Sequence, residues 1–237
     1  MNKNLKVLIA IIYLTCFGAL LYGFFSFFDI TQISNFAYIK DSTKVLIDLK
    51  NQNLIIFTVI FFIFTIAWIL LLGFASPIAL TTGFIFGKYF GTLVSVVSFT
   101  IGCTILYALV SLYFRNLVLK FLPKKIYKFK NLFNKNEFFY FLMFRFAGGG
   151  GIPFAAQNVM PIIFDMKLKN YFYSTLLGLI PSVFVINALG EGIENIIKQN
   201  KDPSFVAIII EPSIYIPLIS FFVILIISNF IKKYLFK

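Results

Sequence analysis

Long apolar runs separated by short polar segments dominate this chain and predict helices that cross a membrane. The runs of spanning length cover residues 7–28, 54–74, 93–114, 171–189 and 213–231. Because a helix rises about 1.5 Å per residue, roughly 20 apolar residues cross a hydrocarbon core of ~30 Å. We therefore predict an all-α integral membrane protein built as a polytopic helical bundle.

The first apolar run follows Lys3 and Lys6, a pattern shared by signal peptides and first transmembrane helices. No small-x-small cleavage site stands out after the run, so we expect residues 7–28 to be a retained helix. Residues 29–53 are polar with balanced charge and predict a solvated connector, in which a short interfacial helix is one alternative.

Two other apolar segments are interrupted by helix-breaking residues. Residues 76–87 are too short to cross a membrane and contain one proline and two glycines. Residues 145–164 contain the run Gly148 to Gly151 and two prolines, and no continuous helix passes through such a sequence unaided. Irregular backbone at membrane depth is tolerated only where protein or a wet cavity surrounds it. We predict that each segment enters the membrane and turns back.

The two interrupted segments belong to an internal repeat. Residues 77–82 align with residues 153–158 at an offset of 76, with proline on proline, alanine on alanine and polar on polar, and the same offset places Gly102 on Gly178. Each unit contains one crossing, so the second copy must enter from the opposite face. We predict two inverted re-entrant hairpins, each followed by a transmembrane helix.

This organisation divides the chain into three predicted parts. The first is an N-terminal transmembrane helix with its polar connector, the second is the membrane domain with both hairpins, and the third is an interfacial segment with a last transmembrane helix. Their ranges are 1–53, 54–192 and 193–237.

The composition excludes a water-soluble fold and most enzyme chemistry. Hydrophobic residues make up 60% of the chain, charged residues only 13%, and the mean hydropathy is +0.93, which leaves too few polar residues to cover a soluble core. The chain has no histidine, and its two cysteines lie in apolar runs as packing residues. Without HExxH or GxSxG, we expect no cofactor, no metal and no enzymatic activity.

Half of the formal net charge of +12 lies in one segment. Residues 115–137 hold seven basic residues against Glu137, and seven minus one gives +6. The positive-inside rule predicts a cytoplasmic loop in a multi-pass protein of the inner cell membrane. We expect membrane lipids as partners, with anionic headgroups at this loop, and no nucleic acid. The sequence assigns no oligomeric state. An amphipathic helix on the headgroups would use Leu117, Phe121, Leu122, Ile126, Phe129 and Phe133.

Arg145 is the charged residue that the apolar pattern explains least. Insertion of arginine at membrane depth costs on the order of 2.5–3.5 kcal/mol, so an arginine there usually has a structural or functional role. One alternative is an anion site made by the guanidinium and the amides of Gly148 to Gly151. The other is structural: Arg145 snorkels to the interface or pairs with Asp165 or Glu191.

Polar residues near the two predicted tips define a candidate path across the membrane. The side-chain amides among them either line a polar cavity or cap freed backbone groups, and the threonines either line it or bond back to their own helix. The candidate path consists of Pro77, Thr81, Thr82, Arg145, Gly149, Gly150, Pro153, Gln157 and Asn158. Lys88, Asp165 and Glu191 are the remaining charges near membrane depth. The two carboxylates either relay protons or are loop-end charges in water. Predicted interface anchors are Trp68, Tyr113 and Tyr171.

Several of these residues stand in a recognisable order. The relevant strings are Phe144-Arg145, Ile152-Pro153-Phe154, Asn158, Asn170-Tyr171, Thr175 to Pro181 and Gly190, with Pro77, Gly83 and Phe86-Gly87 upstream. Over about residues 70–192 the chain resembles the SNARE-associated Golgi protein family, the VTT-domain branch of the DedA superfamily. The resemblance implies two inverted re-entrant loops and a role in moving lipid or another solute across the bilayer.

Members of that family are linked to lipid scrambling, translocation of lipid-phosphate carriers and proton-dependent membrane homeostasis. Two departures matter here. Gly148 to Gly151 occupy a stretch where the family often has a proline, and residues 76–87 lack the acidic residues of the DedA branch, which weakens a proton-coupled mechanism. We expect transmembrane movement of lipid or a small anionic solute between the two loops. The alternative is a non-transporting scaffold that binds partners through its basic loop.

Overall fold

The computed structural model describes residues 45–71, 73–121, 130–199 and 210–235, together with the single residues 15, 18, 19 and 22. The chain divides into two compact units, Met1–Leu54 and Ile55–Lys237. The first unit contributes a helix over Val45–Gln52. Apart from residues 15, 18, 19 and 22, the predicted helix 7–28 lies outside the described residues, as does most of the polar connector. The described residues contain no strand, which confirms the all-α class.

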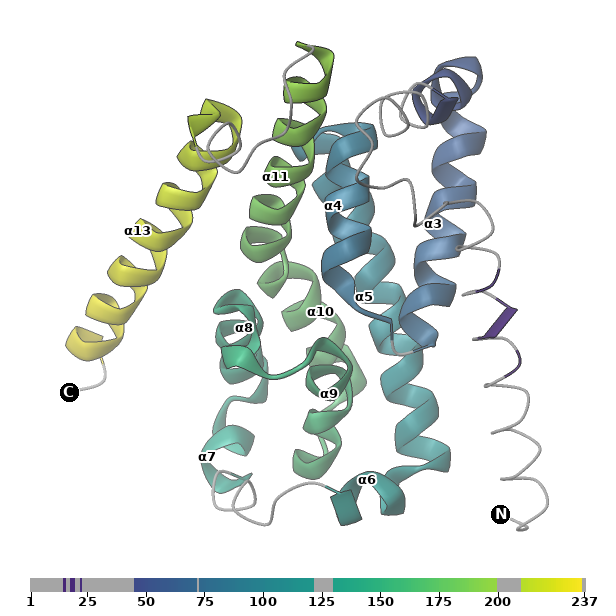
Figure 1. Ribbon diagram of the computed structural model, residues 1–237. Coiled ribbons are helices and arrows are strands. Elements are labelled where there is room, and N and C mark those ends of the chain that lie inside the picture. Colours follow the sequence, from purple (N-terminus) through teal and green to yellow (C-terminus); the bar gives the residue numbers. More distant parts are fainter. Residues whose placement is uncertain are drawn as a thin grey trace. The chain divides into compact units, whose positions relative to one another are not determined.

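Most of the remaining helices follow one another with short breaks, and the longer breaks are residues 122–129 and 199–211 (Figure 1). They are α3 (Leu54–Leu70), α4 (Ala75–Phe86), α5 (Lys88–Tyr113), α6 (Arg115–Phe121), α7 (Lys130–Lys135), α8 (Glu137–Phe146), η3 (Gly148–Gly151), α9 (Phe154–Val159), η4 (Met160–Phe164), α10 (Leu168–Gly178), α11 (Ile180–Lys198) and α13 (Pro212–Leu235). Two of them, α5 and α11, are long and apolar enough to cross a membrane; a third span counts if Val45–Gln52 and α3 form one broken span. This number refers to the described residues only.

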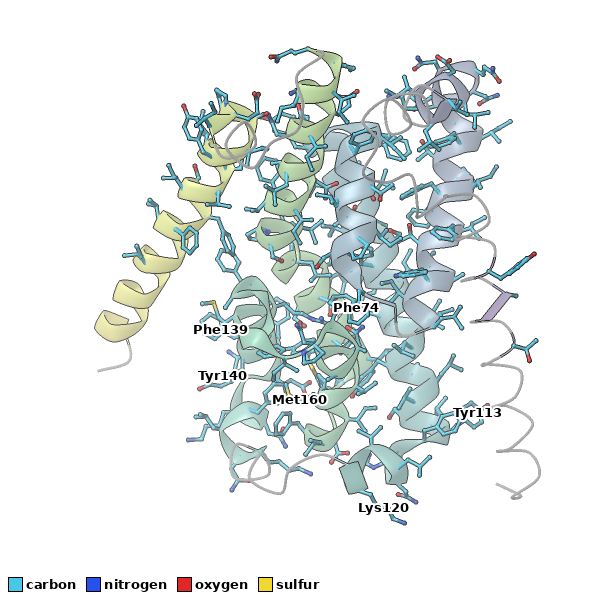
Figure 2. All side chains as sticks on the ribbon, in the orientation of Figure 1. Phe74, Tyr113, Lys120, Phe139, Tyr140 and Met160 are labelled. Carbon is cyan, nitrogen blue, oxygen red and sulfur yellow. The ribbon has the colours of Figure 1, made fainter. Side chains whose placement is uncertain are left out.

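The first hairpin consists of α3 and α4. The ring of Phe86, at the end of α4, lies 5.8 Å from Phe57 and 5.6 Å from Phe61, near the start of α3. The two helices therefore run antiparallel. At the turn, the Trp68 indole donates to the Phe74 carbonyl at 3.0 Å, and the Phe74 ring is exposed (Figure 2).

This hairpin differs from the predicted elements in two ways. The sequence predicts one crossing helix over residues 54–74, but α3 ends at Leu70. The sequence also predicts that proline breaks the next segment, but α4 is continuous because Pro77 lies in its first turn, where the missing amide hydrogen has no helical partner to lose. Gly87, with φ of 78°, then ends α4.

The second hairpin consists of α8, the glycine turn η3, and α9 with η4. All four glycines have positive φ, between 60° and 79°, a region that L side chains rarely adopt. They end α8 and reverse the chain, as predicted. The Glu137 carboxylate at the start of α8 accepts hydrogen bonds from the Asn170 side chain at 2.6 Å and the Lys167 amide at 3.3 Å, beyond the end of η4. The two arms are therefore antiparallel.

The helices that follow the hairpins, α5 and α10–α11, also run antiparallel to each other. Tyr107 of α5 stacks on Tyr171 of α10 with 4.3 Å between ring centroids, and Tyr89 lies 5.8 Å from Phe184 of α11. The predicted crossing over residues 171–189 is broken at Leu179 into α10 and α11. Pro181 accounts for the break, because it cannot donate the hydrogen bond that would join the two helices.

Two serines separated by the predicted offset of 76 make the same hydrogen bonds to their own helices. Ser98 donates to the carbonyls of Val94 at 2.7 Å and Ser95 at 3.1 Å. Ser174 donates to the carbonyls of Asn170 at 2.5 Å and Tyr171 at 3.1 Å. Each residue of the second set lies 76 positions after its counterpart in the first set, and both serines are fully buried.

Two glycines at the same offset make equivalent contacts. A Cβ atom on Gly102 would lie 3.0 Å from Ile69 Cβ and 3.3 Å from the Ile66 carbonyl oxygen, both in α3. A Cβ atom on Gly178 would lie 2.6 Å from Arg145 Cβ and 2.9 Å from the Leu142 carbonyl oxygen, both in α8. Adding 76 to 66 and 69 gives 142 and 145, so Ile69 is the counterpart of Arg145. The two glycines therefore pack against residues that are related by the predicted offset.

Two glycines bring α4 and α11 into backbone contact. A Cβ atom on Gly83 would lie 2.1 Å from the Asn187 carbonyl oxygen, and one on Gly190 would lie 2.1 Å from the Leu80 carbonyl oxygen. Next to this contact, the Glu191 carboxylate accepts a hydrogen bond from the Lys88 amide at 2.9 Å, at the start of α5. The first hairpin is thereby fixed to the helix of the second repeat unit.

The basic segment 115–137 contains two short helices, one at its start and one near its end. Both α6 and α7 contact η4, and they lie toward the end of the bundle that also holds α8 and α9 (Figure 1). Phe133 was predicted to lie on the headgroups, but it is buried and stacks on Phe164 at 4.4 Å. Lys120 points away from the helices (Figure 2). Leu122, Ile126 and Phe129 lie outside the described residues.

Asp165 fixes both ends of the basic segment to η4. Its carboxylate pairs with Arg115 and accepts a hydrogen bond from Lys130 Nζ at 2.8 Å. Partial burial raises the pKa of Asp165, but the hydrogen bonds and charges of Lys130 and Arg115 outweigh that effect and hold the pKa below its ordinary value.

Acidification is therefore expected to remove stability that depends on Asp165. The unfolded state binds its proton at about pH 4, above the folded-state pKa, so this stability is present at neutral pH and is lost as pH falls below about 4. The effect is expected to be about 1 kcal/mol or less because the pair is partly exposed. The melting temperature of wild type should exceed that of Asp165→Asn at pH 7 and approach it at pH 3. A difference independent of pH would contradict this expectation.

A buried arginine cluster as the candidate functional site

Arg145 lies in the last turn of α8, and its side chain is 0% exposed. The guanidinium donates to Asn158 Oδ1 at 2.6 Å, to Gln157 Oε1 at 3.2 Å and to the Tyr171 hydroxyl at 3.2 Å. Three of these four residues come from the second hairpin and Tyr171 comes from α10. The chain reversal at the glycine turn is what brings α9 back against the end of α8.

Aromatic rings enclose the rest of the guanidinium. Its central carbon lies 4.9 Å from the centroid of Phe141, 5.3 Å from Phe154 and 5.9 Å from Tyr171. Phe141 and Tyr171 stack on each other at 5.2 Å. Ring faces carry partial negative charge, so they stabilise the cation without neutralising it. We call Arg145, Gln157, Asn158, Tyr171, Phe141 and Phe154 the arginine cluster.

No carboxylate pairs with Arg145 among the described residues. Both acidic partners considered from the sequence are engaged elsewhere, Asp165 with Arg115 and Lys130, and Glu191 with Lys88 at 3.6 Å. The expectation that Arg145 pairs with either of them is wrong, and its complete burial also excludes snorkelling. Each carboxylate lies next to other basic side chains and pairs with those instead. The cluster therefore holds a buried, uncompensated positive charge.

Two hydrogen-bond donors in the cluster are unused. Arg145 Nε and Asn158 Nδ2 are buried and have no partner. The Cys103 thiol of α5 is also fully buried. A buried donor without an acceptor costs about 1–3 kcal/mol. Unused donors around an uncompensated cation are the arrangement that an anionic oxygen would satisfy.

One residue of the glycine turn packs against the cluster. Gly149 is buried, and a Cβ atom there would lie 2.1 Å from the Gln157 side chain. Gln157 in turn donates to the Ile152 carbonyl at 2.6 Å, so both ends of its amide are engaged. Gly150 and Pro153, which belong to the predicted path, are exposed and contribute the turn and the start of α9.

The first hairpin contributes no side chain to the arginine cluster. Thr81 donates to the Pro77 carbonyl at 2.9 Å and Thr82 to the Ile78 carbonyl at 2.6 Å, so both bond back to their own helix. Pro77 is exposed. In the described part of the chain, no contact joins these residues to Arg145. Since Ile69 is the counterpart of Arg145, the two repeat units differ in charge at the equivalent position.

Sequence reasoning placed three members of the cluster, Phe141, Phe154 and Tyr171, outside the candidate path and missed one neighbour. Tyr171 was expected at the membrane interface, yet it is 0% exposed; Phe141 was not singled out, and Cys103 was expected only to pack. The spacing of Tyr171, Ser174 and Gly178 was the available signal. Residues three and four apart share a helix face, and the small residues on that face indicate close approach of another helix.

These features define an all-helical membrane protein with two opposed helical hairpins and a buried cationic cluster at the tip of one of them. The VTT domain family model matches residues 74–192, which include every candidate path residue. The chain therefore belongs to the VTT-domain family, the family of SNARE-associated and DedA membrane proteins. No solved structure matches the chain. The matched region contains α4 and the whole second hairpin, whereas α13 lies outside it.

Proposed function

We propose that this protein moves an anionic group, either a lipid phosphate or a small anionic solute, across the membrane past Arg145. The observation that carries the proposal is the fully buried guanidinium that has neutral partners, no carboxylate and two unused donors beside it. A charge placed in a medium of low polarity is stabilised by an opposite charge, and here the chain supplies none. A transient anion would supply it.

The helix arrangement supports a site at membrane depth. We propose that both hairpins dip into the bilayer from opposite faces of the inner membrane and that α5 and α10–α11 cross it, giving a multi-pass topology. The antiparallel repeat units are the inverted design in which transporter sites lie near the midplane. Because Arg145 is at the tip of its hairpin, it would then lie near the middle of the bilayer.

Access to Arg145 requires movement of the second hairpin, since the cluster is closed. The Arg145 Cβ packs against Gly178, and the turn is made of four glycines with three exposed members. Such a tip can shift without moving large side chains. We propose a binding protein and conduit rather than an enzyme, because the cluster contains no acid, base or nucleophile pair within reach of a bound group.

The test is flux in proteoliposomes. Purified protein is reconstituted with fluorescent phospholipids, and movement between leaflets is compared with protein-free vesicles and with an uncharged diacylglycerol probe of the same acyl chains. Phosphate-bearing soluble anions form a second arm. The proposal expects protein-dependent flux of a phosphate-bearing probe that exceeds the uncharged probe. No flux above protein-free vesicles, or equal flux of charged and uncharged probes, would overturn it.

The scaffold alternative uses the basic segment instead of the cluster. It expects neutralisation of Lys120, Lys124, Lys125 and Lys128 to matter more than any change at Arg145. The structure gives it no specific support, since Arg115 and Lys130 are already engaged by Asp165. The same vesicles distinguish the two, because a scaffold produces no flux.

A further inference from the structure

A second group of buried polar side chains lies where α4, α5 and α11 meet. A Cβ atom on Gly91 of α5 would lie 2.7 Å from Asn187 Oδ1 and 2.9 Å from the Thr82 carbonyl oxygen, so these two oxygens face the same point. Ser95 lies one helical turn after Gly91 and therefore on the same face of α5. Thr82, Ser95 and Asn187 are each 1% exposed or less. We call these three residues the acceptor cluster.

The oxygens of the acceptor cluster lack donors. Asn187 Oδ1 and Ser95 Oγ are buried and have no hydrogen-bond partner. The amide nitrogen of Asn187 is used elsewhere, since it donates to the Val183 carbonyl at 2.9 Å. The Thr82 hydroxyl donates to the Ile78 carbonyl at 2.6 Å, so its lone pairs remain available to a ligand. Oxygens of this kind are costly to bury unless a donor or a cation meets them.

The acceptor cluster is related to the arginine cluster by the offset of 76. Adding 76 to 82 and 95 gives 158 and 171, the positions of Asn158 and Tyr171. In the arginine cluster the unused atoms are donors of Arg145 and Asn158, whereas in the acceptor cluster they are oxygens, and Ile69 stands at the position that corresponds to Arg145. Unused donors suit an anion, and unused oxygens suit a cation.

The ligand set favours a small monovalent cation. Its amide, hydroxyl and carbonyl oxygens are all neutral, and Glu191, the first acidic residue after Asn187 on α11, is engaged by Lys88. Protein sites for Ca²⁺ and Mg²⁺ use carboxylates, whereas carbonyls and the C-terminal ends of short helices coordinate Na⁺ within membranes. Thr82 lies in the C-terminal half of the short helix α4. The close packing around Gly91 favours Na⁺ over the larger K⁺.

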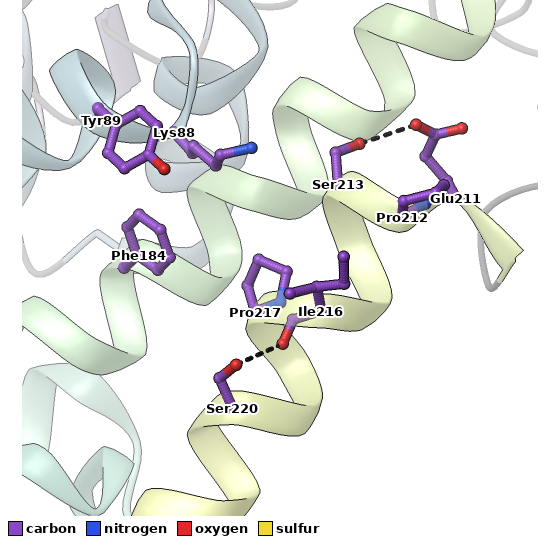
Figure 3. A pocket seen from close by; sticks show the side chains of 9 residues that line it. All are labelled: Lys88, Tyr89, Phe184, Glu211, Pro212, Ser213, Ile216, Pro217 and Ser220. Carbon is purple, nitrogen blue, oxygen red and sulfur yellow. Dashed lines mark hydrogen bonds between the residues drawn. The ribbon is translucent and has the colours of Figure 1, made fainter.

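A cavity of about 560 Å³ between α5, α11 and α13 lies next to the acceptor cluster. Lys88 and Phe184 line this cavity, and each lies three residues before a residue of the contact, Gly91 or Asn187 (Figure 3). The Glu211 carboxylate also lines it and pairs with no basic side chain in the described ranges. A carboxylate at a cavity attracts cations, so a cation can approach the cluster from this side.

We propose that the acceptor cluster binds Na⁺ through Asn187 Oδ1, Ser95 Oγ and the carbonyl and hydroxyl oxygens of Thr82. The expectation of no metal drawn from the sequence concerned histidine and cysteine ligands, which an alkali-metal ion does not need. Binding uses no residue of the arginine cluster and therefore does not rest on the proposed transport function.

The test is thermal unfolding of the purified full chain in detergent, followed by circular dichroism in the chlorides of Na⁺, K⁺ and choline at equal ionic strength. A ligand that binds only the folded state raises the melting temperature. With Na⁺ at about tenfold excess over its dissociation constant, wild type is expected to unfold roughly 3–6 °C higher than in choline. A smaller shift is expected in K⁺, and a Na⁺ titration should saturate as for one site.

Two variants of the cluster and one control connect the shift to the site. Ser95→Ala removes a hydroxyl that has no partner, so it should fold, unfold in choline at or above the wild-type temperature, and lose most of the Na⁺ shift. Asn187→Asp adds a negative charge, so it should be less stable in choline and reach half of its shift at about tenfold less Na⁺. Ser98→Ala removes a buried hydroxyl of α5 that is bonded within its own helix, and it should keep the wild-type shift.

Two outcomes would overturn the sodium site. One is an equal melting temperature of wild type in the three salts, and the other is a Na⁺ shift that Ser95→Ala leaves unchanged. Arg145→Gln is expected to keep the shift. Absence of wild-type flux with the shift intact contradicts only the transport proposal, and absence of the shift with flux intact contradicts only the sodium site.

Discussion

Arg145→Gln is expected to reduce flux of phosphate-bearing probes by about a hundredfold in proteoliposomes. The variant removes the positive charge from the cluster, and a penalty of roughly 2.5–3 kcal/mol for bringing an anion to an uncharged buried site corresponds to that factor. Arg145→Lys keeps the charge but loses the planar, multiple hydrogen-bonding geometry, so about a tenfold reduction is expected.

The Arg145 variant should still fold, and this makes the result interpretable. Removing one partner of a buried ion pair leaves an orphaned charge, but Arg145 has no carboxylate partner to orphan. Glutamine can also keep a hydrogen bond within the cluster. Arg115→Gln, which removes the same charge from a surface pair, is the matched control and should keep wild-type flux. Wild-type flux from folded Arg145→Gln would show that the cluster is structural.

Gly190→Ala is expected to destabilise the fold by about 3 kcal/mol or more, the range of severe overpacking. The added Cβ would lie 2.1 Å from the Leu80 carbonyl oxygen and 2.6 Å from the Phe84 amide nitrogen. These atoms belong to the backbone of α4, which cannot move locally. The whole helix would have to shift, together with its contact at Gly83.

Gly192→Ala provides a control in the same helix. The added Cβ there would lie 2.2 Å from Cγ1 of the buried Ile214 side chain, which has to repack, but no backbone atom of α4 has to move. Alanine also stabilises a helix interior by about 1 kcal/mol relative to glycine, which offsets part of that cost. We expect Gly192→Ala to destabilise the fold less than Gly190→Ala. Thermal unfolding in detergent, followed by circular dichroism, measures both variants, and equal stabilities would contradict the proposed backbone contact.

The helical class and the repeat could be predicted because they depend on local pattern. Apolar runs of spanning length indicate helices, and proline and glycine at the same offset mark equivalent positions whatever the tertiary structure. The four-glycine turn was predictable for the same reason. The break at Leu179 was less so, because proline near the start of one helix looks the same as proline inside a longer one.

The end of α3 carries a local signal, whereas the surroundings of Arg145 depend on tertiary contacts. Gly73, just beyond the end of α3, is a helix-stop signal that the predicted range 54–74 passed over, and its amide donates to the Trp68 carbonyl at 3.0 Å. The Trp68 contact with Phe74, which also holds the turn, is revealed by no spacing rule. Tyr171 was misplaced because aromatic residues are common both in lipid-facing positions and in protein interiors. Whether Asp165 or Glu191 pairs with Arg145 depends on which basic side chains the folded chain places next to these carboxylates.

The equivalence of Gly102 with Gly178, and of Ser98 with Ser174, has an evolutionary consequence. A short ancestral gene encoding one unit could make the same antiparallel pair only if its product inserted in both orientations and formed a homodimer. In the present chain the two units are covalently joined, so each can carry a different residue at the equivalent position, isoleucine at position 69 and arginine at position 145. The chain is thus pseudosymmetric in shape and polarised in chemistry.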